Sequence, residues 1–407
     1  MVRRVLTFLF KSRRRVVCTA ALLLAGLFLS IVHFRFYGHL EGIYVLKGKT
    51  GGFEVKDDLI FGDEDRIVLA LPAEPIFKFL RGDVGHAMGI TRLDKEWFRF
   101  DGSGYVRSYL ADGTSFLMCF SRFIDSAGLE TKGVFVGGGL PFDLENDRRA
   151  SMSESGMAYY NGKEWLHIWC NVNESIASWH HPEIPIAPST WRFLGSSVRK
   201  KTEDELVLTS SHEVDIDGTP FRIDRTASFK AGSRHTTLAI TISNVGQVPA
   251  GYFYVYGDEP WVGEYGSSAG NVGWVQDRLI KHEATINPLH YGWAGYFDYG
   301  NDAAGEKHDH SGVANFIEWQ AGLRPDLVYF SNKIGTFAEE SARVPLASDN
   351  NRVIFLQWGP RMLSPGQSET IILSVGMADR NPANGFPVKP DTSGTLRLLL
   401  SYLAPDA

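Results

Sequence analysis

The chain has 407 residues, 44% of them hydrophobic, and a formal net charge of −6. Its first 35 residues contain seven cations and no acidic residue, so the rest of the chain carries a formal charge of −13. A surface this acidic repels nucleic acid and anionic lipid headgroups, which excludes nucleic acid as a partner of this part of the chain.

The N-terminus predicts one membrane crossing. A basic tail at residues 1–15 precedes an apolar run at residues 16–34. A helix of this length roughly matches a hydrocarbon core about 30 Å thick, and the cations favour a cytoplasmic tail. We therefore expect the lipid bilayer as a partner and an extracytoplasmic domain, periplasmic in a bacterium. The alternative is a cleaved signal peptide, although no A-x-A-like site follows.

The segment at residues 35–65 is rich in glycine and charge, which indicates a stalk and the first strands. We expect residues 66–407 to form the ectodomain. Prolines interrupt the strand pattern at residues 178–189, so a smaller front region is expected to end at about residue 190.

The ectodomain is predicted to be all-β, a large antiparallel β-sandwich. Residues 221–229 and 237–243 alternate between apolar and polar side chains, as half-buried strands do. Asp-Gly and Asn-Gly pairs mark tight hairpin turns. Cys119 and Cys170 fall in strand-like runs, and a disulfide and two buried thiols remain alternatives. The final apolar run, residues 396–403, is a strand or a short helix.

Three turn-and-strand motifs resemble the galactose mutarotase-like supersandwich superfamily. They are Arg-Thr-Ala-Ser-Phe-Lys-Ala-Gly at 225–232, Leu-Ala-Ile-Thr-Ile-Ser-Asn-Val-Gly-Gln-Val-Pro at 238–249 and Leu-Ser-Pro-Gly-Gln-Ser-Glu-Thr at 363–370. The resemblance implies a supersandwich with a sheet facing carbohydrate. Sugar epimerases of this fold share an Asn-His-x-Tyr-Phe-Asn segment that supplies a catalytic histidine. This chain has Tyr-Gly-Asp-Glu-Pro-Trp at 256–261, so the resemblance does not imply a simple aldose 1-epimerase.

A first candidate site lies at residues 257–266, where carboxylates and aromatic rings stand between glycines. Sugar sites combine carboxylates, which bind hydroxyls or move protons, with aromatic faces that stack on pyranose rings. Asp258 and Glu259 are the candidate acids and bases, and Trp261 is a candidate stacking group. The alternative is a solvated loop whose tryptophan closes the edge of the sandwich.

A second candidate lies at residues 287–299, which lack alternation and therefore predict a functional loop. His290 is the candidate acid or base near neutral pH, and Trp293 and Tyr296 are candidate stacking groups together with Trp274. A histidine among aromatic residues is also often a packed, hydrogen-bonded side chain.

Two further features contain residue types that bind ligands. His308 and His310 share one face of an extended strand, but a zinc site needs three or four protein ligands, so no metal and no cofactor is assigned. Arg225 lies in an alternating strand and is expected to bind substrate, paired with Glu259 or with a cross-strand carboxylate.

The sequence therefore predicts a membrane-anchored extracytoplasmic protein that binds or modifies a glycan or oligosaccharide, with a role in surface polysaccharide metabolism. An enzyme of this kind would be a hydrolase, a lyase or an isomerase. Its catalytic residues would be Glu259, Asp258 and His290, and its substrate-binding residues Trp261, Trp274, Trp293, Tyr296 and Arg225. The alternative is a non-catalytic, membrane-tethered scaffold for a protein partner.

Overall fold

The structure, a computed structural model, describes residues 24–25, 43–48, 51–56, 104–110, 112–120, 122–124, 130–132, 156–163, 165–169, 172–186, 191–202, 204–258, 260–263, 270–300, 310–320, 322–332, 344–346 and 352–403. The chain divides into two compact units, Met1–Ile43 and Tyr44–Ala407. The boundary between them falls inside the segment for which a stalk was predicted. The domain boundaries expected at residues 66 and 190 stay predictions.

The predicted membrane helix lies outside the described residues, apart from residues 24 and 25. Among the residues that the structure describes, no helix combines the length and the apolar character that a bilayer crossing requires.

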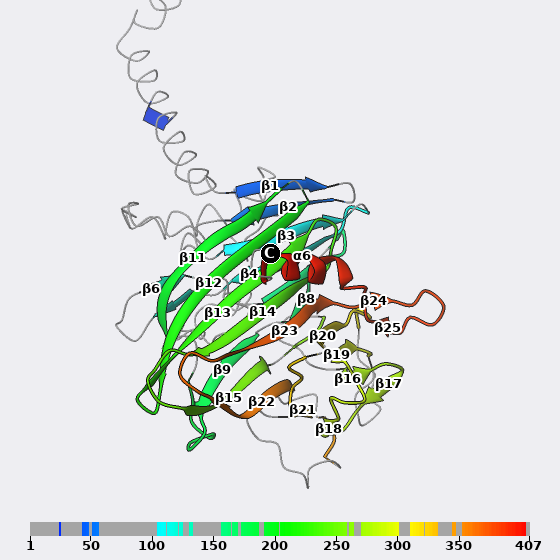
Figure 1. Ribbon diagram of the computed structural model, residues 1–407. Helices are drawn as coiled ribbons and strands as arrows, with labels where there is room; N and C mark the ends of the chain where they lie inside the picture. Colours follow the sequence, from blue (N-terminus) through cyan, green and yellow to red (C-terminus); the bar gives the residue numbers. More distant parts are fainter. Residues whose placement is uncertain are drawn as a thin grey trace, which may run out of the picture. The chain divides into compact units, whose positions relative to one another are not determined.

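Three antiparallel sheets make up most of the described chain (Figure 1). The first sheet has the strand order β1 (Ile43–Gly48), β2 (Gly51–Lys56), β3 (Gly104–Leu110), β4 (Ser115–Phe120), β7 (Gly156–Tyr160) and β8 (Trp165–Trp169). A separate pair is formed by β5 (Arg122–Ile124) and β6 (Glu130–Lys132).

The second sheet also has six strands. Their order is β10 (Pro185–Ile186), β9 (Asn173–Ser178), β15 (Ala250–Asp258), β22 (Val353–Leu363), β21 (Leu327–Ser331) and β18 (Ala284–Ile286). This sheet combines strands from the middle and the end of the sequence, so several of its pairings join segments that are far apart in the sequence.

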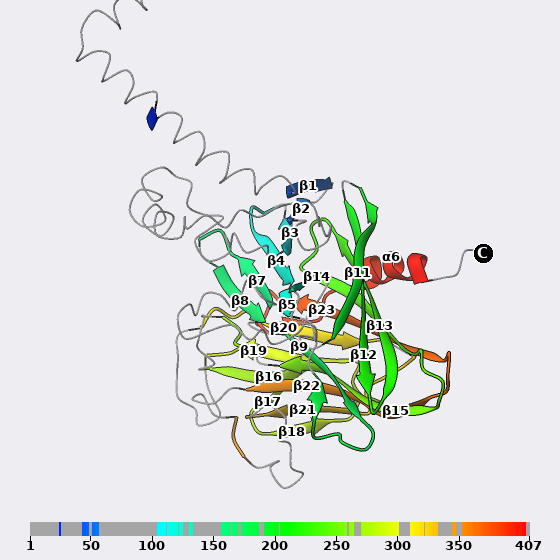
Figure 2. The same ribbon diagram turned by 90° about the vertical axis from the view of Figure 1, so that its left-hand side faces the viewer.

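The third sheet has nine strands, and its long members run side by side in Figures 1 and 2. Their order is β11 (Arg192–Lys201), β12 (Glu205–Ile216), β13 (Thr219–Lys230), β14 (His235–Asn244), β23 (Ser368–Met377), β20 (Asn315–Trp319), β19 (Trp293–Asp298), β16 (Asn271–Val275) and β17 (Arg278–Ile280). A short pair follows it, β24 (Asp379–Arg380) and β25 (Pro387–Val388).

The predicted turns and alternation are confirmed where the structure describes them. Asp217 and Gly218 have φ angles of 53° and 79° and join β12 to β13, as a two-residue hairpin turn requires. In β13, Phe221 and Ile223 are fully buried whereas Arg222 between them is exposed. The all-β class and the antiparallel sandwich are thus confirmed for the described part of the chain.

One hydrophobic core serves all three sheets. Its buried side chains come from the first sheet (Phe116, Ile168), the second (Ile176, Leu356) and the third (Phe221, Ile240). Burial of apolar side chains at about 25 cal/mol per Å² is the main driving force for such an arrangement. The sheets therefore stabilise one another rather than forming separate cores.

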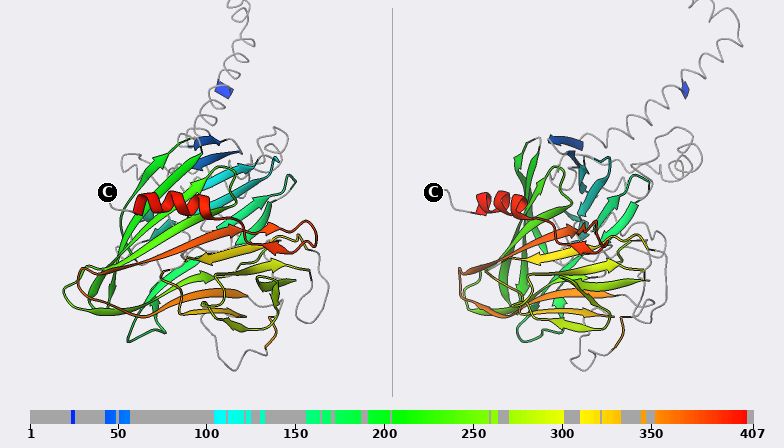
Figure 3. Two further views of the ribbon diagram at one scale, coloured as in Figure 1. Left: turned by 45° about the vertical axis from the view of Figure 1, so that its right-hand side comes forward. Right: turned by 90° about the vertical axis from the view of Figure 1, so that its right-hand side faces the viewer.

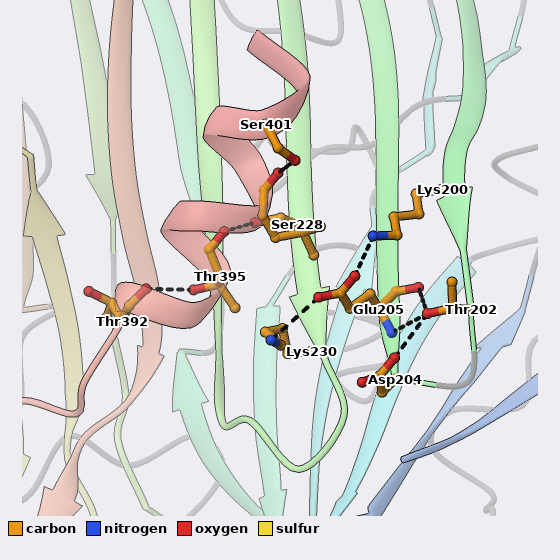
Figure 4. Close-up of polar contacts among 10 residues, drawn as sticks. Lys200, Thr202, Asp204, Glu205, Ser228, Lys230, Thr392, Thr395 and Ser401 are labelled. Carbon is orange, nitrogen blue, oxygen red and sulfur yellow. Dashed lines mark hydrogen bonds and ion pairs between the residues drawn. The ribbon is translucent and has the colours of Figure 1, made fainter. Parts of the chain in front are cut away.

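The final apolar run forms a helix, α6 (Ser393–Leu403), which packs on β13 and β14 (Figure 3). The contact between α6 and these two strands includes buried hydrogen bonds. The Ser228 hydroxyl donates to the Thr395 carbonyl at 2.8 Å, and the Thr395 hydroxyl lies 2.7 Å from that of Thr237. Figure 4 shows the contact between Ser228 and Thr395, and it also shows Glu205, which pairs with Lys200 and Lys230.

We expect Thr395→Val to lower the free energy of unfolding by about 1–2 kcal/mol, because it removes a buried hydroxyl and one partner of Thr237. Urea unfolding measures the difference. Ser401→Ala is the matched control on the same helix, because Ser401 is exposed, and it should change stability by less than about 0.5 kcal/mol. Equal effects of the two substitutions would show that the hydrogen bonds of Thr395 do not stabilise the packing of α6 on the sheet.

Candidate functional site

The candidate site forms around Arg225, at a position where the alternation of β13 places an apolar residue. Phe221, Ile223, Ala227 and Phe229 occupy the same face of the strand and are buried. Arg225 is buried with them, with 1% of its surface exposed. A charged side chain reaches such a position only when partners satisfy it.

Glu174 on β9 of the second sheet is that partner. The Arg225 Nε donates to Glu174 Oε1 at 2.5 Å, and the Nη2 forms an ion pair with the same oxygen. The Tyr254 hydroxyl, from β15, donates to Glu174 Oε2. The pair therefore bridges the second and third sheets, with both charged side chains closed to solvent.

Two aromatic side chains also lie next to the guanidinium. His212 on β12 places its Nδ1 3.3 Å from Arg225 Nη1. Because a guanidinium only donates hydrogen bonds, this nitrogen is the acceptor and the imidazole is neutral. The Arg225 Cζ lies 5.0 Å from the ring centre of Trp191, within cation–π range. We call Glu174, Arg225, His212, Tyr254 and Trp191 the inter-sheet cluster.

The protonation states of the cluster follow from its burial. Burial raises the pKa of Glu174, while the Arg225 charge and the Tyr254 hydrogen bond act in the opposite direction. Burial, with a smaller contribution from Arg225, holds the pKa of His212 well below its usual range. Burial and the Glu174 charge raise the pKa of Tyr254. The cluster thus combines a neutral imidazole, a tyrosine that stays protonated and a carboxyl group whose pKa is raised by burial, which are groups suited to proton transfer.

The segment at residues 257–266 is described only in part. Asp258 ends β15, whereas Glu259 lies outside the described residues. Trp261 is half-buried, with a φ of 37°. The candidate roles of these three residues stay predictions.

Side chains of the third sheet contact this segment at Val262 and Gly263. The Asn271 side chain accepts from the Val262 N–H at 2.8 Å and donates to the Val262 carbonyl at 2.9 Å. Asp298 accepts from the Ser311 N–H and hydroxyl, both at 2.7 Å. A Cβ on Gly263 would lie 2.4 Å from Asp298 Oδ2, so only glycine fits there. The backbone next to Trp261 is therefore fixed by several independent contacts.

The prediction of a loop at residues 287–299 is wrong for its second half, because residues 293–298 form β19. Ala294, Tyr296 and Phe297 are all buried, so β19 is covered on both faces and shows no alternation. His290 lies outside this strand in an exposed turn, where its N–H donates to the Asn287 carbonyl at 3.1 Å.

The structure places two of the predicted stacking groups in the core. Trp274 is 1% exposed and its Nε1 donates to the Asn315 carbonyl at 2.9 Å, and Tyr296 is fully buried against Phe330. Trp293 is half-buried, with its ring centre 4.4 Å from that of Trp274. These residues are not brought together with Arg225 in any contact that the described chain shows.

No group of three or more histidine, cysteine, aspartate or glutamate residues that could hold a metal ion occurs within the described ranges. His310 is exposed, and His308 lies outside the residues that the structure describes.

Sequence reasoning missed Glu174, His212 and Tyr254. Glu174 comes from the facing sheet rather than from a strand next to β13, whereas Glu259, the other acid named for Arg225, lies outside the described residues. One signal was available. In the strand at residues 173–178, Glu174 shares its face with Ile176, so it too is a charged residue on an apolar face.

No family model and no curated protein matches the chain. Solved structures that resemble it include galactose mutarotase-like and aldose epimerase proteins, the superfamily that the turn motifs resemble. A galactose mutarotase-like protein from Clostridium acetobutylicum is 9% identical, with a TM-score of 0.34 over 69% of this chain and 97% of that chain.

Two further structures resemble the chain. A candidate aldose 1-epimerase from Klebsiella pneumoniae is 9% identical, with a TM-score of 0.37 over 89% of this chain and 91% of that chain. An aldose epimerase homologue from C. elegans is 8% identical, with a TM-score of 0.34 over 69% of this chain and 100% of that chain. At this level of similarity the solved structures assign neither a superfamily to the chain nor a role to any of its residues.

Proposed function

We propose that this protein binds or modifies a carbohydrate and that the inter-sheet cluster is part of its site. The observation that carries the proposal is the convergence of Glu174, Arg225, His212 and Tyr254 between two sheets. Sugar hydroxyls both donate and accept hydrogen bonds, and this cluster offers carboxylate acceptors beside hydroxyl and guanidinium donors. The cluster is closed to solvent, so binding requires a local opening of the sandwich.

The strand β15 links the cluster to the candidate residues of the sequence, because it carries Tyr254 and ends at Asp258. In our proposal Glu259 acts nearest the chemistry as acid or base, with Asp258 and His290 as further candidates. Trp261 and Trp293, both half-buried, are the proposed stacking groups. The reaction class, if turnover occurs, is hydrolysis, elimination or isomerisation.

We also propose that residues 16–34 tether the protein to a membrane, with the sheets on the extracytoplasmic side and a surface polysaccharide as the source of the glycan. The cations at residues 1–15 and the apolar run that follows them support this part of the proposal.

We expect one class of glycan to raise the melting temperature of the full-length protein saturably. At a ligand concentration a hundred times the Kd, binding stabilises the folded state by about 2.7 kcal/mol. A thermal-shift screen over saccharides measures the effect. Glu259→Gln should abolish any turnover without lowering the melting temperature.

The carbohydrate proposal is wrong if no saccharide shifts the melting temperature of protein shown to be folded. Unchanged turnover in Glu259→Gln would remove only the catalytic role of that residue and leave binding in place.

The second candidate function is a scaffold for a protein partner, and an exposed apolar patch favours it. Trp179 and Ile184, at the β9–β10 hairpin, are 40% and 60% exposed, and Met362 is 53% exposed. The Trp179 N–H donates to the Gly251 carbonyl, and Gly251 pairs with Met362 across β15 and β22, so these side chains lie at one end of the sandwich. Apolar side chains that gather on a surface often mark interaction sites.

A further inference from the structure

Three tyrosines follow one another on the same face of β15. Tyr252, Tyr254 and Tyr256 are each fully buried, and each is separated from the next by one residue, which is the repeat of a strand. The Tyr252 hydroxyl donates to Glu369 Oε2 at 2.7 Å, and that of Tyr254 donates to Glu174. The Tyr256 hydroxyl has no hydrogen-bond partner among the residues that the structure describes.

A buried hydroxyl without a partner is costly, because it gives up its hydrogen bonds to water and receives none in return. The two neighbouring tyrosines show that this strand otherwise satisfies its buried hydroxyls. The Tyr256 hydroxyl is therefore able to bind an oxygen atom that the described residues do not supply.

The position of Tyr256 places that oxygen beside Glu174. The two residues are direct partners in the pairing of β15 with β9, so their side chains leave the sheet on the same face, with Cβ atoms about 4.5–5.5 Å apart. The Glu174 charge is one of the influences that raise the pKa of Tyr256, after burial itself, which agrees with this proximity.

Glu174 still has acceptor capacity on Oε2. A carboxylate offers about four lone-pair sites, two on each oxygen. Arg225 Nε donates to Oε1, where Nη2 also forms an ion pair, and the Tyr254 hydroxyl donates to Oε2. An oxygen that accepts from Tyr256 and donates to Glu174 would satisfy both side chains at once, and a hydroxyl group does both.

We propose that Tyr256 is a ligand-binding residue that donates a hydrogen bond to a hydroxyl of a neutral saccharide, while the same hydroxyl donates to Glu174. This inference rests on the proposed function and names its substrate class. An anionic sugar is disfavoured at this point, because the Arg225 charge is already paired with Glu174 and a second carboxylate would face Glu174 without a counter-ion.

Tyr256→Phe tests the proposal, with Tyr252→Phe as the matched control on the same strand. In the full-length protein we expect Tyr256→Phe to keep or raise the melting temperature without ligand, since it removes the unpartnered hydroxyl. It should weaken the affinity for the neutral saccharide that stabilises the wild-type protein about tenfold. Tyr252→Phe should lower the melting temperature, because Glu369 loses its partner, and leave affinity unchanged.

The outcomes separate the inference from the proposed function. If the wild-type protein binds a neutral saccharide and Tyr256→Phe binds it equally well, the role of Tyr256 is wrong while the function stands. If a uronic acid binds as tightly as its neutral counterpart, the substrate class is wrong. If the folded wild-type protein binds no saccharide, the proposed function fails and this inference fails with it.

Discussion

Replacing Arg225 by methionine is expected to lower the free energy of unfolding by about 3–5 kcal/mol. The substitution leaves the Glu174 carboxylate buried without its cation, and an uncompensated buried charge costs that much in comparable cases. Methionine fills much of the space of the arginine side chain, so loss of volume contributes little. Equilibrium urea unfolding of the variant and the wild-type protein measures the difference.

The double substitution Arg225→Met with Glu174→Met distinguishes charge from packing. Because it removes both charges, we expect the double variant to be more stable than either single variant. The Tyr254 hydroxyl then loses its acceptor, so part of the loss remains. If the stability losses of the two single variants add up to that of the double variant, the Arg225 and Glu174 charges are not energetically coupled.

Trp274→Ala is expected to destabilise the fold by about 3–5 kcal/mol. Its indole is 1% exposed, packs against Trp293 and donates a hydrogen bond to the Asn315 carbonyl, so its removal leaves both a cavity and an unpaired acceptor. The same unfolding measurement checks this value.

Leu289→Ala is the control for Trp274→Ala. Leu289 is 73% exposed, and its truncation should change stability by less than about 0.5 kcal/mol. A stable Trp274→Ala variant that has lost saccharide binding would contradict the core assignment and restore Trp274 as a stacking group.

The sequence predicted the strands that have one buried face and one solvent-exposed face. The alternation in β13 and the Asp217-Gly218 turn are local signals, readable over a few residues, and both are confirmed. Residues 293–298 gave no such signal because β19 is buried on both sides, and a strand of that kind shows no alternation of apolar and polar residues.

The candidate site was less predictable because its contacts are not local. Arg225 was recognised as a candidate, but Glu174 lies 51 positions away in sequence and in another sheet. Which faces of two sheets meet depends on the packing of the whole domain. Charged residues on apolar faces of two strands would have been a usable signal, since each such residue requires a partner.

The strand order of the third sheet bears on how the chain folds during synthesis. β11 to β14 follow one another as hairpins, but the next neighbour of β14 is β23, more than a hundred residues further along the chain. Until β23 has been synthesised, β14 presents unpaired backbone groups along ten residues, and such an edge invites pairing with other chains. Pairings this distant also slow folding. β23 therefore covers the exposed edge of β14 and joins the hairpins β11 to β14 to β20, β19, β16 and β17 in one sheet.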